Sequence, residues 1–148
     1  MTSAMTPQQL AEASAAAMWA DDRASKHLGM QIDAVGPGTA TLSMTVAREM
    51  TNGHDLCHGG FIFSLADSTF AFACNSYNQR AVAQMVQITF IAPAFHGDRL
   101  TATAREVSRR GRGGIYDIAV TNQKGEQIAV FRGHSRTVKG TLVPDPTE

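Results

Sequence analysis

The chain has 148 residues, and its 13 lysines and arginines balance 13 aspartates and glutamates to a formal net charge of zero. This length suits one domain with one core, and a hydrophobic fraction of 43% excludes an intrinsically disordered chain. A neutral chain lacks the basic surface that general nucleic-acid binding requires, so we expect no nucleic-acid partner.

The sequence also argues against a membrane or secreted protein. No apolar run approaches the roughly 18–20 residues that a membrane-spanning helix needs. Residues 1–19 lack the basic region before an apolar stretch that is typical of a signal peptide. Two cysteines, Cys57 and Cys74, make no disulfide framework. We therefore expect a cytoplasmic protein with no membrane partner, and its neutrality favours self-association.

The amino-terminal part is predicted to be helical. Thr6-Pro7-Gln8-Gln9 combines an N-cap, a proline at the first helical position and a glutamine three residues after the cap. This predicts an alanine-rich helix that runs to about Trp19. Asp21 and Asp22 then begin a second, short helical turn, which Gly29 ends.

Strand patterns follow this helical segment. Between residues 39 and 46, apolar side chains alternate with Thr and Ser, and Gly36-Pro37-Gly38 forms a turn to a preceding strand near residues 31–35. Four more strands are expected at about Ala81–Ala92, Arg99–Ser108, Gly114–Thr121 and Gln127–Val138. Their short, glycine-containing connections indicate a largely antiparallel sheet.

Between these two blocks of strands lies one long predicted helix, from Gly59 to about Ser76. It is apolar nearly all round, which is typical of a buried helix. In so short a chain, only a curved sheet wrapped around the helix can bury it. The order β-β-α-β-β-β-β therefore predicts a hotdog fold of the α+β class. We expect a single domain over residues 1–148: a helical arm (1–27), a hotdog core (28–140) and a tail (141–148).

Asp67 is the exception on this apolar helix. An unpaired buried carboxylate costs several kcal/mol, so its presence needs a reason. One interpretation places it at a dimer seam, where Ser64, Ser68 or the backbone of a partner satisfies it. The other makes it a catalytic carboxylate, and composition does not decide between them.

The helix start, His58-Gly59-Gly60, is the second candidate feature. Successive glycines let a substrate approach the backbone closely, and the first N–H groups of a helix have no partners within the helix. The positive end of the helix dipole would polarise a carbonyl oxygen placed there. A closely packed start of an ordinary helix explains the two glycines equally well.

The spacing of these features has a geometric consequence. Gly59 and Asp67 lie eight residues apart on one helix, which is about 12 Å along its axis. A nucleophile and an oxyanion donor must both lie about 3 Å from one reacting group. Asp67 can instead serve the Gly59 end of a symmetry-related, antiparallel helix, so an active site here predicts a twofold dimer.

Residues 52–67 closely resemble the PaaI-type branch of hotdog-fold acyl-CoA thioesterases, the hydroxyphenylacetyl-CoA thioesterases of phenylacetate catabolism. The shared pattern is an Asn-Gly-His start, a central His-Gly-Gly and Asp67 at the end, followed by Phe-Ala-Phe-Ala-Cys-Asn. Later landmarks at residues 89–93, 97–104, 114–118 and 131–133 also match, so the resemblance spans about Trp19 to Gly140.

The resemblance implies a role for each residue of the pattern. Asp67 is the nucleophile or general base at the thioester carbon, and the Gly59 N–H polarises the carbonyl. Asn52 positions the attacked group or the water, and His58 shapes the loop. Related animal enzymes carry a serine on the strand facing the helix, where this chain has Ala83 beside a glutamine, so a serine-assisted water is not carried over.

A basic hairpin follows later in the chain, where Arg109, Arg110 and Arg112 flank the glycines at positions 111, 113 and 114. The segment from residue 105 to residue 139 contains eight basic and three acidic residues, a net charge of +5. The hairpin is either a solvated turn or a phosphate-binding edge for the nucleotide end of coenzyme A, and the resemblance favours the phosphate-binding edge. Adding the expected acyl and pantetheine contacts, the candidate substrate-binding residues are Gly60, Ser68, Phe90, Pro93, Ala94, Phe95, Arg109, Arg110, Gly111, Arg112, Gly113 and Arg136.

Other chemistries are weaker candidates. Cys57 precedes a helix start, but it is more simply a small buried residue. His54, Cys57 and His58 lack a fourth ligand at a recognisable spacing, so we expect no metal site. We expect an acyl-CoA thioesterase without a cofactor, because coenzyme A is part of the substrate, and at least a homodimer, with a homotetramer expected. The alternatives are a hotdog enoyl-thioester hydratase or dehydratase and a non-catalytic acyl-CoA-binding module.

Overall fold

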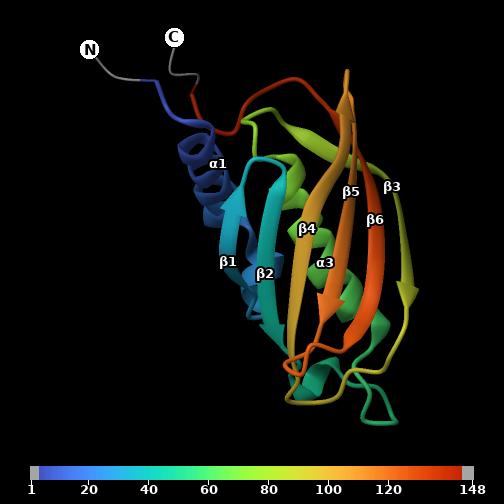
Figure 1. The fold of residues 1–148 in the computed structure, drawn as a ribbon. Coiled ribbons are helices and arrows are strands. Elements are labelled where there is room, and N and C mark those ends of the chain that lie inside the picture. The colour runs from blue at the N-terminus through green and yellow to red at the C-terminus, as the bar shows by residue number, and fades with distance from the viewer. Residues whose placement is uncertain (1–3, 145–148) are drawn as a thin grey trace.

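The computed structural model describes residues 4–144, so the ends of the predicted arm (1–3) and tail (145–148) lie outside the described residues. Its elements follow the predicted order (Figure 1). They are α1 (Pro7–Asp21), α2 (Arg23–His27), β1 (Gln31–Gly36), β2 (Thr39–Thr45), η1 (Arg48–Met50), α3 (Gly59–Cys74), β3 (Ala81–Phe90), β4 (Arg99–Arg110), β5 (Gly113–Thr121) and β6 (Gln127–Thr137). The short 3-10 helix η1 was not predicted.

The six strands form one sheet in the order β1-β2-β4-β5-β6-β3, and every neighbouring pair is antiparallel. The sheet curves around α3, while α1 lies beside β1 (Figure 1). This arrangement confirms the predicted hotdog architecture and its α+β class. None of the helices within residues 4–144 is long and apolar enough to cross a membrane.

The capping box predicted at the start of α1 is present. The Thr6 hydroxyl accepts from the Gln9 N–H at 3.1 Å, and the Gln9 side chain accepts from the Thr6 N–H at 3.0 Å. The prediction that Asp21 helps begin the second helical turn is wrong, because Asp21 is the last residue of α1. Asp22 alone caps α2, accepting from the Ser25 N–H at 2.9 Å.

The core lies between the concave face of the sheet and α3. Ala40, Leu42 and Met44 point into it, which confirms the alternation predicted for β2. Gly133 on β6 lets the sheet approach the buried ring of Phe70, because a Cβ at Gly133 would lie 2.7 Å from that ring. Burying an aromatic side chain of this size contributes about 1.5–3 kcal/mol.

One stripe of α3 is left uncovered by its own chain. Gly60 is exposed, and Ser64, Asp67 and Ala71 are only half-buried. These residues lie one helical turn apart, so they share one face of the helix. The prediction that α3 is buried all round is therefore wrong for a single chain, because the curved sheet does not close over this side.

The sheet edge formed by β3 is also unpartnered. β3 pairs with β6 on one side and with no other strand of the described residues on the other. Its side chains Val82 and Met85 are each 50% exposed, which is unusual for apolar residues on a strand. An exposed apolar edge strand is a ready template for pairing with another chain.

Candidate active site

The loop before α3 is organised by Asn52. The side-chain oxygen of Asn52 accepts from the backbone N–H groups of His54 at 2.9 Å and Leu56 at 3.3 Å. The backbone N–H of Asn52 donates to the Leu56 carbonyl at 2.8 Å. Within residues 4–144 the side-chain NH₂ of Asn52 donates to no acceptor. Asn52 therefore holds the loop with one end of its amide and keeps two donors available at the other.

The first turn of α3 leaves one backbone donor free. His58 is the N-cap, and its Nδ1 accepts from the Gly60 N–H at 3.0 Å. The Gly59 N–H has no acceptor among the described residues. It is therefore an available donor at the positive end of a 16-residue helix, as an oxyanion-binding role requires.

A cavity of about 370 Å³ opens at this helix start. It brings together five of the predicted site residues: Asn52, Gly59, Phe90, Pro93 and Ala94. Its walls are completed by Leu56, Cys57, Ile62, Ile91 and Ala92, four of which sequence reasoning did not single out as site residues. The apolar run that follows β3 in the sequence was the pattern that could have indicated Ile91 and Ala92 as cavity-lining residues.

Phe95, which we also expected near the substrate, does not line this cavity. Its N–H donates to the Asp98 side chain at 2.9 Å, and its own side chain is half-exposed. Immediately before it, the Ala94 carbonyl accepts from the Cys57 N–H at 2.8 Å. This bond fixes the Asn52 loop against the segment that follows β3.

Asp67 lies two turns further along α3. Its carboxylate has no hydrogen-bond donor among residues 4–144 and is half-buried, and this burial raises the pKa of Asp67 above its usual value of 3.8. It does not line the cavity at Gly59. Because both residues belong to one unbroken helix, the predicted separation of about 12 Å holds within the chain.

Ser68, the neighbour of Asp67, faces the amino-terminal arm. Its hydroxyl lies 2.9 Å from the Ser25 hydroxyl, which in turn donates to Asp22 at 2.7 Å. The structure thus gives Ser68 a contact that joins α2 to α3.

The basic hairpin between β4 and β5 lies at the opposite end of α3 from Gly59 (Figure 1). Arg109 stacks on Tyr77, with its guanidinium carbon 3.4 Å from the ring centroid, and Arg112 donates to the Thr137 carbonyl at 3.0 Å. The strand register sets Arg136 opposite Gly113 at the base of this hairpin. Arg110 and Arg136 are exposed, and neither forms an ion pair with a described residue.

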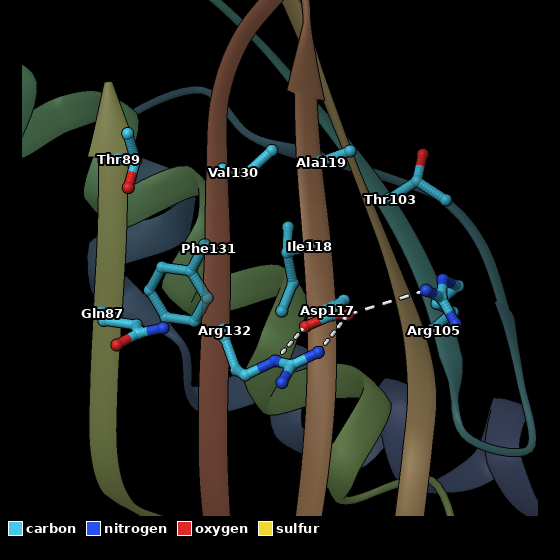
Figure 2. Close-up of a pocket in the computed structure, with 10 residues that line it drawn as sticks. All are labelled: Gln87, Thr89, Thr103, Arg105, Asp117, Ile118, Ala119, Val130, Phe131 and Arg132. Carbon is cyan, nitrogen blue, oxygen red and sulfur yellow. Dashed lines mark hydrogen bonds and ion pairs between the residues drawn. The ribbon is translucent and has the colours of Figure 1, made fainter. Parts of the chain in front are cut away.

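Arg105 and Arg132, which also belong to this basic segment, lie away from the hairpin. On the outer face of the sheet, Asp117 accepts from Arg132 at 2.6 and 2.8 Å and lies 3.6 Å from Arg105 (Figure 2). Arg132 and Arg105 hold the pKa of Asp117 below its usual value, Arg132 most strongly through its hydrogen bonds. These three residues line a cavity of about 510 Å³ that contains none of the predicted site residues. The basic segment is therefore not one continuous patch.

The weaker chemistries find little support. Both cysteines are free and buried, and burial raises the pKa of Cys57 to about 11, so its thiol is protonated at neutral pH. Within the described part of the chain, no three His, Cys, Asp or Glu side chains are grouped to hold a metal ion. Ala83 lies on β3 next to a register shift that sets Gln84 outside the regular pairing. Neither residue is a serine, so this stretch cannot supply the serine that the related animal enzymes carry.

Comparison with known proteins identifies the class. The family model of the thioesterase superfamily matches residues 54–129, and the chain belongs to this superfamily. It is 46% identical over 126 residues to the acyl-coenzyme A thioesterase PaaI of Escherichia coli (strain K12), covering 85% of this chain and 90% of that protein. These matches confirm the PaaI-type resemblance.

Solved structures agree with this assignment. The structure of the E. coli PaaI protein from the phenylacetic acid degradation operon superimposes with a TM-score of 0.91 at 44% identity, covering 92% of this chain and 99% of that one. The TT0310 protein of Thermus thermophilus has a TM-score of 0.76 at 32% identity, covering 79% of this chain and 98% of that one.

Proposed function

We propose that this chain hydrolyses (hydroxy)phenylacetyl-CoA-like thioesters to the free acid and coenzyme A, in a site built by two chains. Its superfamily and its identity to PaaI make it an acyl-CoA thioesterase. The aryl-acetyl group is our choice of substrate within that activity. It is supported by the resemblance to PaaI, whose E. coli structure is described as belonging to phenylacetic acid degradation.

The observation that carries the mechanism is a free backbone donor at the mouth of an apolar cavity. We place the thioester carbonyl oxygen on the Gly59 N–H, where the helix dipole stabilises the negative charge that develops on attack. Asn52 lines the same cavity, and its NH₂ donates to no described residue, so it can orient the carbonyl or a water. His58 keeps the helix start in shape by capping Gly60.

Asp67 supplies the second half of the chemistry. As a general base it takes a proton from water while the hydroxide adds to the carbonyl carbon; the C–S bond then breaks and the coenzyme A thiolate receives the proton. As a nucleophile it forms an acyl-aspartyl anhydride that water then hydrolyses. Both routes use only protein groups, water and the substrate, so the proposed reaction needs no cofactor.

The distances require two chains. Gly59 and Asp67 are too far apart on one helix to meet at one carbonyl, whereas antiparallel packing of two α3 helices about a twofold axis brings each Asp67 toward the other Gly59. The unpaired β3 edge and the uncovered stripe of α3 offer the surfaces for such a dimer. We therefore propose at least a homodimer, and a homotetramer by its resemblance to PaaI-type proteins.

The same reasoning assigns the nucleotide end of coenzyme A. The basic hairpin lies beyond the far end of α3, about 22 Å from Gly59 of its own chain but only about 10 Å beyond Asp67 along the axis, so in the antiparallel pair it lies nearer the cavity of the partner. Arg110 and Arg136 form no ion pair with a described residue, and we propose that they bind the phosphates.

A coenzyme A substrate and two free cysteines also support our proposal of a cytoplasmic location.

The test is steady-state hydrolysis of a panel of aromatic and aliphatic acyl-CoAs by the wild type, Asp67→Asn and Asp67→Ala, with Asp33→Asn as an exposed carboxylate control on β1. We expect both Asp67 variants to lose hydrolysis and Asp33→Asn to keep it. Intact hydrolysis in both Asp67 variants would overturn the mechanism.

The same panel separates the alternatives. Hydration of crotonyl-CoA without thioester cleavage would indicate a hydratase, although His58 already uses its Nδ1 as the helix cap. Tight binding of acyl-CoA without turnover would indicate a binding module.

A further inference from the structure

The Phe90 ring lies directly against the residue that we assign as oxyanion donor. A Cβ placed on Gly59 would lie 2.9 Å from Cζ of Phe90, 3.2 Å from Cε1 and 3.4 Å from Cε2. Carbon atoms in ordinary contact stay about 3.5–4.0 Å apart. There is thus no room for one methyl group between the Cα of Gly59 and the ring.

The main chain on both sides of this contact is tied down. Phe90 is the last residue of β3, and the two N–H groups that follow it, those of Ile91 and Ala92, both donate to the Ile128 carbonyl, at 2.8 and 3.2 Å. On the opposite wall, the loop before α3 is held by the hydrogen bond that the backbone N–H of Cys57 donates to the Ala94 carbonyl. Widening the gap at Gly59 by moving either main chain would strain these hydrogen bonds, which leaves the Phe90 ring as the part free to move.

This position sets the ring beside the acyl group of a thioester bound at Gly59. A carbonyl oxygen that accepts from the Gly59 N–H lies about 2.9 Å from that nitrogen. The nitrogen and the crowded Cβ position are both attached to the Cα of Gly59, and we place the carbon next to the carbonyl on the side of this Cα that the ring occupies. A CH₂ next to the carbonyl presents only hydrogens to the ring, whereas a branched carbon presents a methyl group to it.

We propose that Phe90 is a specificity-determining residue, which admits thioesters with an unbranched CH₂ next to the carbonyl and excludes those branched at that carbon. The proposal rests on the thioesterase function proposed above and names the substrate class of the same site. Phe90 is 51% exposed, so its ring can be truncated without opening the core.

The experiment compares two substrates that differ by one methyl group, phenylacetyl-CoA and 2-phenylpropionyl-CoA. A single misfitting methyl group in a packed pocket changes kcat/KM by about 10–200-fold, and we expect the wild type to prefer phenylacetyl-CoA by a factor in this range. Phe90→Ala should reduce the preference at least about tenfold, mainly by faster hydrolysis of the branched substrate, with Phe90→Leu in between. Val107→Ala, which truncates an exposed apolar residue on β4, should leave the preference unchanged.

The outcomes distinguish a failure of the role assigned to Phe90 from a failure of the proposed thioesterase function. Hydrolysis of both substrates at equal rates by the wild type, or an unchanged preference in Phe90→Ala and Phe90→Leu, overturns the role of Phe90 and leaves the thioesterase intact. Absence of hydrolysis of any acyl-CoA by the wild type overturns both. Thermal denaturation shows whether the Phe90 variants are folded, because the ring is half-exposed and its truncation should leave the melting temperature close to that of the wild type.

Discussion

The oxyanion role of Gly59 can be tested by removing its backbone N–H. Gly59→Pro deletes the backbone N–H, while Gly59→Ala keeps it and introduces the same Cβ against Phe90. Proline is favoured at the first position of a helix, and His58 has the extended backbone (φ −60°, ψ 133°) that a residue before proline prefers. The deleted N–H donates to no acceptor within residues 4–144, so the substitution breaks no hydrogen bond of the described chain.

The two variants should therefore have similar stability and different activity. Removal of one oxyanion donor costs about 10²–10³ in kcat, so we expect Gly59→Pro to be slower than Gly59→Ala by that factor, with melting temperatures within a few degrees. Steady-state hydrolysis of phenylacetyl-CoA and thermal denaturation measure the two quantities. Equal kcat in the two variants would refute the assignment of the Gly59 N–H.

Further predictions concern the other groups of the site. Because burial raises the pKa of Asp67 above 3.8, ionising it opposes folding; Asp67→Asn should raise the melting temperature at pH 7, and this gain should vanish below about pH 4, where the carboxyl is protonated in both states. For the wild type, kcat/KM should fall on acidification through that raised pKa, measured as a pH–rate profile. Asn52→Asp keeps the loop-binding oxygen and removes the NH₂ donors, so it should leave the melting temperature nearly unchanged and lower kcat roughly tenfold or more. Arg110→Ala and Arg136→Ala should each raise KM roughly tenfold for phenylacetyl-CoA, the equivalent of one charge-assisted hydrogen bond, and leave hydrolysis of the N-acetylcysteamine thioester, which lacks the nucleotide, unchanged. Equal effects on both thioesters would show that the hairpin acts on stability.

Local patterns predicted the elements of this chain well because each pattern is set by neighbouring residues. The capping box at Thr6, the alternation along β2 and the apolar run of α3 all depend on side chains within a few positions of one another. Element ends were less accurate: β4 continues to Arg110 and β3 stops at Phe90. These limits are set by pairing with strands distant in the sequence.

The site was predictable only where a motif carried it. The resemblance pointed to Asn52, Gly59 and Asp67, and the structure joins the first two in one cavity. The contact of Phe90 with Gly59 could not be predicted, because it depends on how β3 and α3 pack across the core. In the same way, the net charge of the basic segment did not show that Arg132 is paired with a carboxylate on the outer face.

The central claim is that each active site takes Gly59 from one chain and Asp67 from another. Co-production of Asp67→Asn and Gly59→Pro chains in equal amounts tests it directly, because each variant alone is expected to be inactive. With random pairing, about a quarter of the sites combine an intact Gly59 with an intact Asp67, so the mixture should recover about a quarter of the wild-type activity. A mixture no more active than either variant alone would contradict a site shared between two chains.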